Sequence, residues 1–101
     1  MGEKNDAVKF YQGTMVVADL LLQDGPYKGW VAIKWLYPGE RKFSAIKDVK
    51  RIETEIRHQR LKGWLASSER EHTTMHRILS KMGATPYGED ENAIFFMKEV
   101  A

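Results

Sequence analysis

Apolar positions follow one another almost without interruption near the start of this chain. From Lys9 to Leu22 the residues are mostly apolar and β-branched, and they are densest from Met15 onward. Such a run suits a strand buried on both faces, or a buried helix. The turn residues QDGPYKG follow at 23–29, and a second apolar run occupies 30–37. Two such runs around a Gly- and Pro-rich turn favour strands and predict a β-hairpin.

The hydrophobic period changes to that of a helix between Glu40 and Leu61. The apolar residues there recur at steps of three and four, so they share one helix face. They are Phe43, Ile46, Val49, Ile52 and Ile56. Gly63 suits the left-handed position that follows a helix, so we expect the helix to end at Lys62–Gly63. A short buried strand should follow at residues 64–66.

A second, shorter helix is expected near residues 69–82. Ser68 and Glu71 have the spacing of a capping box, in which a hydroxyl and a carboxylate three residues later satisfy free amides. Its apolar inner face consists of Met75, Ile78, Leu79 and Met82. Gly83 should end it, and residues 85–87 are a candidate for a short extra strand. A charged turn then leads into a final strand from Ala93 to Val100.

These elements predict an α/β fold, an α+β sandwich, in the order β-β-α-β-α-β. A strand, a long helix and another strand form a crossover, so the strands near residues 33 and 65 should be parallel. The hairpins at both ends are antiparallel, so the sheet should be mixed and mostly antiparallel with one parallel crossover. We expect a single domain over residues 1–101, with residues 1–7 disordered.

Composition narrows the function classes. The chain has 101 residues, of which 43% are hydrophobic, and its formal net charge is only +2. The near balance of charges gives no support for a strong polyanion binder. Cysteine is absent, which excludes disulfides, a thiolate nucleophile and cysteine-ligated metal. There is no apolar run of about 20 residues and no signal-peptide pattern, so we expect a cytoplasmic protein without a membrane partner.

The order of elements and the second helix resemble the C-terminal two-thirds of the GNAT superfamily, the acyl-CoA-dependent N-acetyltransferases. The likeness covers residues 30–97, and the run RILSKMGA at 77–84 resembles the end of the family's helix. Many members carry Asn at the start of this helix, a small residue three on, Tyr seven on, and Gly-Phe at eleven and twelve. Those positions are held here by His72, Met75, Leu79, Gly83 and Ala84. The family's Tyr, which often protonates the leaving CoA thiolate, is therefore replaced by Leu79.

A second hallmark of the family is a Gly-rich loop that holds the CoA pyrophosphate on backbone amides at a helix N-terminus. The segment here is LYPGERKFSA, residues 36–45. The glycines that should follow Arg41 are missing. Phe43 occupies this part of the segment, where a side chain would crowd a phosphate. The resemblance implies that acetyl-CoA, if it is bound, meets the amides from Gly39 to Phe43 with help from Arg41 and Lys42.

The remaining candidate site residues lie at the C-terminal ends of the two parallel strands. Ligands tend to bind at such ends, and the resemblance places the pantetheine there, beside Tyr37 and Ser67. With Leu79 unable to donate a proton, His72 is the candidate catalytic acid, because imidazole titrates near neutral pH. Tyr37 and water are the alternatives. The alternative for Tyr37 and Ser67 is structural, as a strand-end aromatic and a helix cap.

Two further patterns bear on other chemistry. His72 and His76 are four residues apart, but no third ligand is near in sequence, so we expect no metal site. Basic residues predominate along the long helix, which would suit phosphates or simply a solvated face.

Trp30 and Trp35 are an odd number of residues apart in one strand, so they should point to opposite faces unless the strand is bulged. One of them is therefore expected in a cleft or at an interface.

Three function classes stay open. The favoured one is a catalytically silent or weakly active GNAT-like protein that binds another protein. The RKF start of the long helix at 41–43 and the Gly-Ala end of the second helix at 83–84 resemble divergent acetyltransferase-like proteins of tailed phages. That resemblance implies a phage-encoded protein that acts on a host or virion protein in the host cytoplasm or the virion. The alternative is an acetyl-CoA-dependent N-acetyltransferase, and the second alternative is a small nucleic-acid-associated protein. The cofactor is accordingly none, or acetyl-CoA. We also expect a homodimer that buries the strand edge near Lys9–Leu22 or a tryptophan-bearing face.

Overall fold

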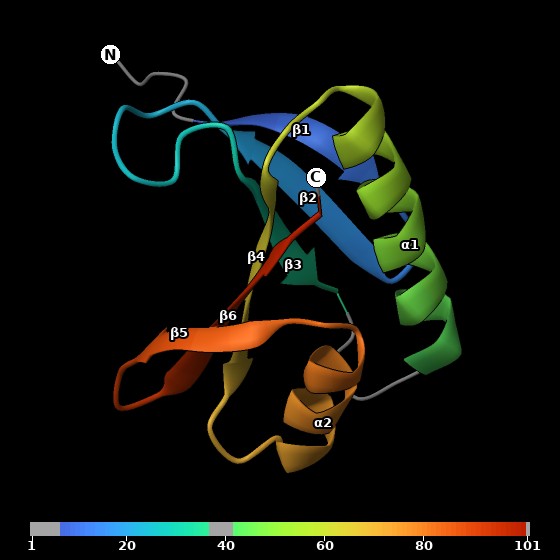
Figure 1. Ribbon diagram of the computed structural model, residues 1–101. Helices are drawn as coiled ribbons and strands as arrows, with labels where there is room; N and C mark the ends of the chain where they lie inside the picture. The colour runs from blue at the N-terminus through green and yellow to red at the C-terminus, as the bar shows by residue number, and fades with distance from the viewer. Residues whose placement is uncertain (1–6, 37–41, 101) are drawn as a thin grey trace.

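The computed structural model describes residues 7–36 and 42–100, with Lys42 and Phe43 described by their backbone alone (Figure 1). The elements are β1 (Ala7–Gln12), β2 (Val16–Leu21), β3 (Val31–Trp35), α1 (Lys42–His58), β4 (Gly63–Glu69), α2 (Thr73–Lys81), β5 (Thr85–Glu89) and β6 (Ala93–Glu99). Among the described residues, no helix is long and apolar enough to span a bilayer.

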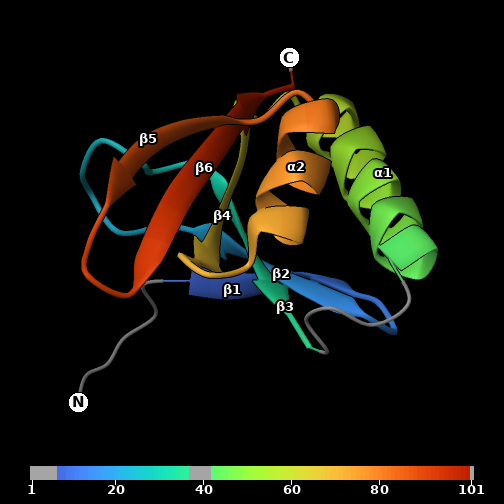
Figure 2. The ribbon, with the colours of Figure 1, turned by 90° about the horizontal axis from the view of Figure 1, so that it is seen from below.

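The six strands form one sheet in the order β1-β2-β3-β4-β6-β5. Only β3 and β4 pair in parallel, across the α1 crossover, and every other neighbouring pair is antiparallel. The predicted mixed, mostly antiparallel sheet with one parallel crossover is therefore confirmed. Both helices pack against the same face of this sheet, as Figure 2 shows, and within the described ranges the opposite face carries no helix.

The run from Lys9 to Leu22 is two strands and not one, which corrects the predicted element order. The chain turns at Gly13–Thr14, where the Gly13 amide donates to the Val16 carbonyl at 2.9 Å. Glycine is required there because a Cβ would lie 2.5 Å from Oδ2 of Asp48. That buried carboxylate accepts hydrogen bonds from the Tyr11 hydroxyl at 2.9 Å and the Met15 amide at 3.1 Å. One aspartate of α1 thus fixes the whole β1–β2 hairpin.

The order is therefore β-β-β-α-β-α-β-β, because the candidate strand near residues 85–87 is also present as β5. The edge strand at this end of the sheet is β1, and it covers the edge of β2 that we expected to be open. Ala7, expected to be disordered, is the first residue of β1, while residues 1–6 lie outside the described part of the chain.

The predicted end of the first helix and the predicted start of the second helix are both wrong, and β4 between them is longer than expected. Helix α1 ends at His58, and the left-handed residue after it is Arg60, with φ of 59°, in place of Gly63. Gly63 begins β4, where a side chain would collide with the carbonyl of Lys98. Ser68 does not cap a helix, because it lies within β4 opposite Ile94 of β6. Helix α2 begins four residues after Glu69, and its N-cap residue makes no side-chain hydrogen bond.

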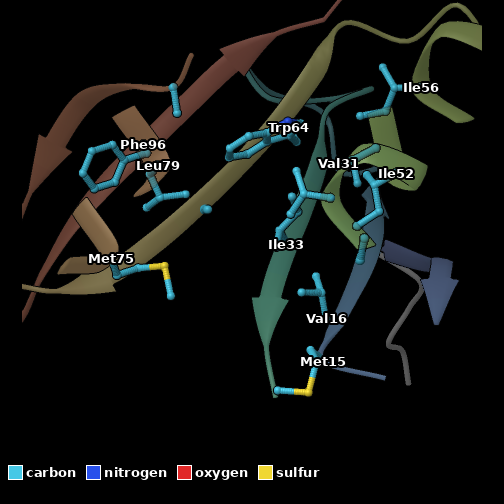
Figure 3. Close-up of a cluster of buried hydrophobic side chains, with 14 residues drawn as sticks. Met15, Val16, Val31, Ile33, Ile52, Ile56, Trp64, Met75, Leu79 and Phe96 are labelled. Carbon is cyan, nitrogen blue, oxygen red and sulfur yellow. The ribbon is translucent and has the colours of Figure 1, made fainter. Parts of the chain in front are cut away.

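The core lies between the sheet and the two helices and has two lobes (Figure 3). One lobe joins β2 and β3 to α1, where the predicted apolar stripe buries Val49, Ile52 and Ile56. The other joins β4 and β6 to α2 through Met75, Leu79 and Phe96, which are also buried. Trp64 is fully buried between them, as Figure 3 shows. The apolar faces of both helices are therefore used to close one continuous core.

A buried carboxylate anchors Trp64. Glu53 of α1 is 7% exposed and accepts hydrogen bonds from Nε1 of Trp64 and Nζ of Lys98, both at 2.8 Å. Arg57 lies 3.9 Å from its other oxygen. A buried charge is tolerated only when it is paired and hydrogen-bonded in this way. Glu53 therefore locks α1 to the first residues of β4 and the last residues of β6.

Candidate ligand cleft between strands β3 and β4

The two parallel strands separate toward their carboxyl ends. Their ladder consists of only two residue pairs, Val31 with Trp64 and Ala32 with Leu65. Beyond these pairs β3 continues to Trp35 and β4 to Glu69, and Figure 3 shows the two ribbons diverging. Residues at the diverging ends have backbone groups on their inner edges that are not used by the β3–β4 ladder. This is the end of the crossover at which ligands tend to bind.

A cavity of about 240 Å³ lies beside these diverging ends. It is lined by Trp35, Ser67, Ser68, Glu69, His72, Met75 and Ala93. The lining comes from β3, β4, the start of α2 and β6, so residues from distant parts of the sequence meet here. Two of the predicted site residues, Ser67 and His72, are among them.

Trp35 spans the gap between the two strands. Its indole Nε1 donates a hydrogen bond of 3.0 Å to the backbone carbonyl of Ser67. The side chain is half-buried, whereas Trp30 is only 6% exposed. The expectation that one of the two tryptophans lies in a cleft agrees with this placement. The bond satisfies a strand-edge carbonyl that a bound ligand would otherwise meet.

One polar group in the cavity lining, the hydroxyl of Ser68, is buried without a hydrogen-bond partner in the described part of the chain. Ser68 is 6% exposed, and its Oγ has no hydrogen-bond partner among the described residues. Leaving a buried hydroxyl unpaired costs about 1–3 kcal/mol, so such groups are rare and call for an explanation. Ser68 lines the cavity, but its Oγ has less than 1 Å² of accessible surface, so the hydroxyl is buried in the cavity wall.

His72 stands at the N-cap of α2, on the rim of the cavity. Its Nε2 lies 3.6 Å from Oε1 of Glu69, and both side chains are largely exposed. His76 behaves differently, because its Nε2 lies 2.8 Å from the Glu69 carbonyl and its ring packs 5.6 Å from that of Phe96. Both histidines thus approach Glu69, one at its carboxylate and the other at its backbone carbonyl. Among the described residues, no group of three or more potential ligands could hold a metal ion.

Only some of the other predicted site residues lie in the part of the chain that the structure describes. Tyr37, Gly39 and Arg41 lie outside the described residues, so their predicted roles at the cofactor stay predictions. Lys42 and Phe43 begin α1. Leu79, which holds the position of the family's Tyr, is fully buried in the core and does not line the cavity.

Sequence reasoning missed several residues of this cavity. The sequence predicts a helix cap for Ser68 and a place in the core alone for Met75. Ala93 was given no role. The alternation of β4 contained a signal for Ser68, since it has the same parity as the buried Trp64 and Ala66 and so shares their face. No comparable signal exists for Ala93, which reaches the cavity only because β6 pairs with β4 at Glu69.

Comparisons with known proteins bear on the fold. The structure is similar to that of yncA, a putative acetyltransferase from Salmonella typhimurium solved with its cofactor acetyl-CoA, with a TM-score of 0.65 and 15% identity over 86% of this chain. It is also similar to an acetyltransferase from Streptococcus agalactiae, with a TM-score of 0.62 and 14% identity over 84% of this chain. The chain spans 58% and 59% of the lengths of these two proteins.

Neither a scan against protein-family models nor a search of curated proteins finds a match. The structural similarity at this low identity concerns the fold, and it shows that the fold is a divergent GNAT-like one. The resemblance seen in the sequence is confirmed at that level.

Proposed function

We propose that this chain is a catalytically silent GNAT-like protein that acts by binding another protein. The observation that carries the proposal is the hydrogen bond from the Trp35 indole to the Ser67 carbonyl across the diverging strands. An acyl-CoA bound as the resemblance implies would insert its pantetheine between these strands. Trp35 already spans that gap, so the cofactor would have to displace a half-buried indole and its hydrogen bond.

The chemistry of the cavity also supports a silent protein. A leaving thiolate needs a proton donor within hydrogen-bond reach. The position of the family's Tyr is filled by Leu79, which is apolar and fully buried. His72 is left as the candidate acid, on an exposed rim where nothing in the described structure orients its ring toward the space between the strands.

A protein partner is supported by the face of the sheet that carries no helix in the described ranges. Tyr87 contacts Tyr27 and Phe95 there, with ring centroids 5.7 Å and 6.2 Å apart. Tyr27 and Tyr87 are 38% and 39% exposed. Exposed tyrosines are enriched at protein interfaces because they present a large apolar area together with a polar hydroxyl.

Thermal unfolding with and without acetyl-CoA tests the silent reading. A ligand at 100 times its Kd stabilises the folded state by about 2.7 kcal/mol. We expect no shift of the melting temperature for the wild-type protein at millimolar acetyl-CoA. Trp35→Ala should gain a shift if the indole is the obstacle, and Tyr87→Ala on the helix-free face serves as the matched control. A large wild-type shift would reject the proposal.

Acetyl-CoA-dependent N-acetyl transfer is the second candidate. A specific observation favours it, because His72 lines the same cavity as the unpaired hydroxyl of Ser68. On this reading His72 protonates the leaving thiolate. Acetyl transfer to an amine substrate that is lost in His72→Ala and kept in His76→Ala would establish the enzyme and displace the silent reading.

The homodimer is proposed on the same grounds as the protein partner. The surfaces available to a second copy are the edge of β1 and the helix-free face of the sheet. Sedimentation at roughly tens of micromolar, a concentration suited to ordinary interface affinities, separates a dimer from a monomer. A protein that stays monomeric there would remove this part of the proposal.

A further inference from the structure

A second cavity lies between the two helices, away from the cleft described above. Its volume is about 420 Å³, within the range of about 300–1,000 Å³ that is usual for small-molecule sites. Its lining consists of Ile46, Val49, Lys50 and Glu53 from α1, Ile78, Lys81 and Met82 from α2, and Lys98 from β6. Figure 2 shows that the two helices that supply most of this lining, α1 and α2, lie side by side on one face of the sheet.

The walls of this inter-helix cavity are apolar. Val49 is 1% exposed, and Ile46, Ile78 and Met82 are half-buried. The three half-buried residues belong to the apolar faces of the two helices but are not fully covered by the core. Apolar surface left open in this way is the usual lining of a ligand pocket.

Charge in the cavity is unbalanced toward the positive. Three lysines face one carboxylate, and that carboxylate is already engaged, because Glu53 accepts from Lys98 at 2.8 Å and from the indole of Trp64 at 2.8 Å. Lys50 and Lys81 are exposed, and neither has an ion-pair partner among the described residues. Two ammonium groups, one from each helix, therefore remain for an anion.

Lys98, which lines the cavity, packs against the end of α2. The stem of Lys98 passes close to Gly83, where an added Cβ would lie 3.2 Å from Cε of Lys98. Gly83 has a φ of 94°, which favours glycine and ends α2 at this point. The Lys98–Glu53 pair thus lies between the end of α2 and α1, and it forms part of the cavity lining without using Lys50 or Lys81.

We propose that the inter-helix cavity binds a medium-chain carboxylate. The hydrocarbon chain would lie on Val49, Ile78 and Met82, and the carboxylate would lie between Lys50 and Lys81. An apolar wall with two ammonium groups that have no ion-pair partner within the described ranges fits an anion with an apolar tail better than a neutral lipid or a purely polar anion. A free carboxylate suits a compact cavity of this volume, whereas a docked helix needs a groove long enough for several successive side chains. This site is independent of the function proposed for the cleft.

The test is a titration of the intact protein with octanoate, followed by amide chemical shifts in NMR. We expect saturable shifts confined to residues 46–53, 78–83 and 98. Octan-1-ol has the chain without the charge, and acetate has the charge without the chain. Each should bind at least about tenfold more weakly, a difference of about 1.4 kcal/mol.

Paired variants locate the anion. Lys50→Gln combined with Lys81→Gln should weaken octanoate binding about tenfold, again about 1.4 kcal/mol. Lys34→Gln, which changes an exposed lysine of β3 outside the cavity, should leave it unchanged. Met82→Gln provides a second readout, since it should weaken octanoate and octan-1-ol alike.

Several results would overturn the site. One is an absence of saturable shifts at millimolar octanoate, and another is shifts that persist unchanged in the double lysine variant. Equal binding of octan-1-ol would remove the role of the lysines. Saturable binding of an acidic, leucine-containing peptide to a protein that ignores octanoate would assign the cavity to a protein partner and reject the carboxylate.

Discussion

The two ends of the β3–β4 pair are each held by a tryptophan, but in different ways. At the amino ends the strands are paired, and the fully buried Trp64 donates to Glu53, which also binds Lys98. At the carboxyl ends the strands are apart, and the half-buried Trp35 donates to the Ser67 carbonyl. The first indole joins three elements through a buried charge, while the second joins two strands through one neutral hydrogen bond.

This difference implies that the two ends of the strand pair contribute unequally to the free energy of folding, and that the cleft end contributes less. A hydrogen bond to a charged group is worth about 1.5–3 kcal/mol and a neutral one about 0.5–1.5 kcal/mol, before packing is considered. The amino end should therefore carry a large part of the folding free energy. The carboxyl end should be changeable without loss of the fold, which is the property expected of a site that can open or be altered.

The largest effect is expected from Trp64→Ala. Truncating a buried aromatic costs about 3–5 kcal/mol, and here the change also removes one of the donors to the buried Glu53 carboxylate. Urea denaturation followed by circular dichroism measures the loss in free energy of unfolding. Trp35→Ala is the matched control and should cost clearly less. Equal losses for the two variants would show that the two ends are not different in kind.

Gly63→Ala should also destabilise strongly. The new methyl group would collide with the carbonyl of Lys98 in the paired strand β6, and overpacking of this kind costs about 1–3 kcal/mol. Gly88→Ala is the control, because its methyl group would meet only Phe95, at an ordinary 3.8 Å. If both variants melt at the same temperature, the amino end of β4 is less tightly packed than the structure indicates.

A smaller effect is expected from Trp35→Phe, which keeps an aromatic ring and removes the N–H donor. The lost bond is neutral and half-buried, so we expect a decrease of about 0.5–1.5 kcal/mol in the free energy of unfolding. The matching change Trp64→Phe should cost more, because its acceptor is a buried carboxylate. The reverse order, measured by the same urea titrations, would contradict the comparison.

The smallest effect concerns alkaline pH and the β1–β2 hairpin. Burial raises the pKa of Tyr11; Arg51 opposes this, and the hydrogen bond and negative charge of Asp48 add to it. The unfolded chain then releases the tyrosine proton at lower pH, near the ordinary value of about 10, so it binds fewer protons than the folded state there. Stability from this group is present below that pH and falls as pH rises through the folded pKa.

Tyr11→Phe should therefore lose less stability than the wild-type protein between pH 9 and pH 11, a window of about one unit on each side of the ordinary tyrosine pKa. Thermal melts across this window measure it. Tyr27→Phe is the control, since Tyr27 lies exposed on the other side of the sheet. Parallel pH profiles for Tyr11→Phe and the wild-type protein would show that Tyr11 does not contribute.

Much of the fold could be predicted because its apolar patterns are local. The stripe of α1 and the final strand were found from periodicity alone. Ser68 shows where local reasoning fails, because its spacing to Glu71 fits a helix cap but pairing with Ile94 keeps it in the sheet. The turn at Gly13 was missed because its need for glycine comes from Asp48, 35 positions later in the sequence.

The candidate site was predictable in part for the same reason. Ser67 lies in the last three residues of β4 and His72 lies three residues beyond its end, so their place at the carboxyl end of the strand could be predicted from their order in the chain. The bond from Trp35 to Ser67 depends on where β3 and β4 stop pairing. That point is set by the packing of both helices against the sheet, and no local pattern contains it.

The parallel pairing of β3 with β4 also has a kinetic consequence. The hairpins β1–β2, β2–β3 and β5–β6 join strands that follow one another closely, but β4 can pair with β3 only after the chain closes a loop that contains all of α1. Such non-local pairing is slow because its entropy is lost before its contacts form. Trp64 becomes buried in that step, so its fluorescence should follow the late docking of the C-terminal half onto an already formed meander.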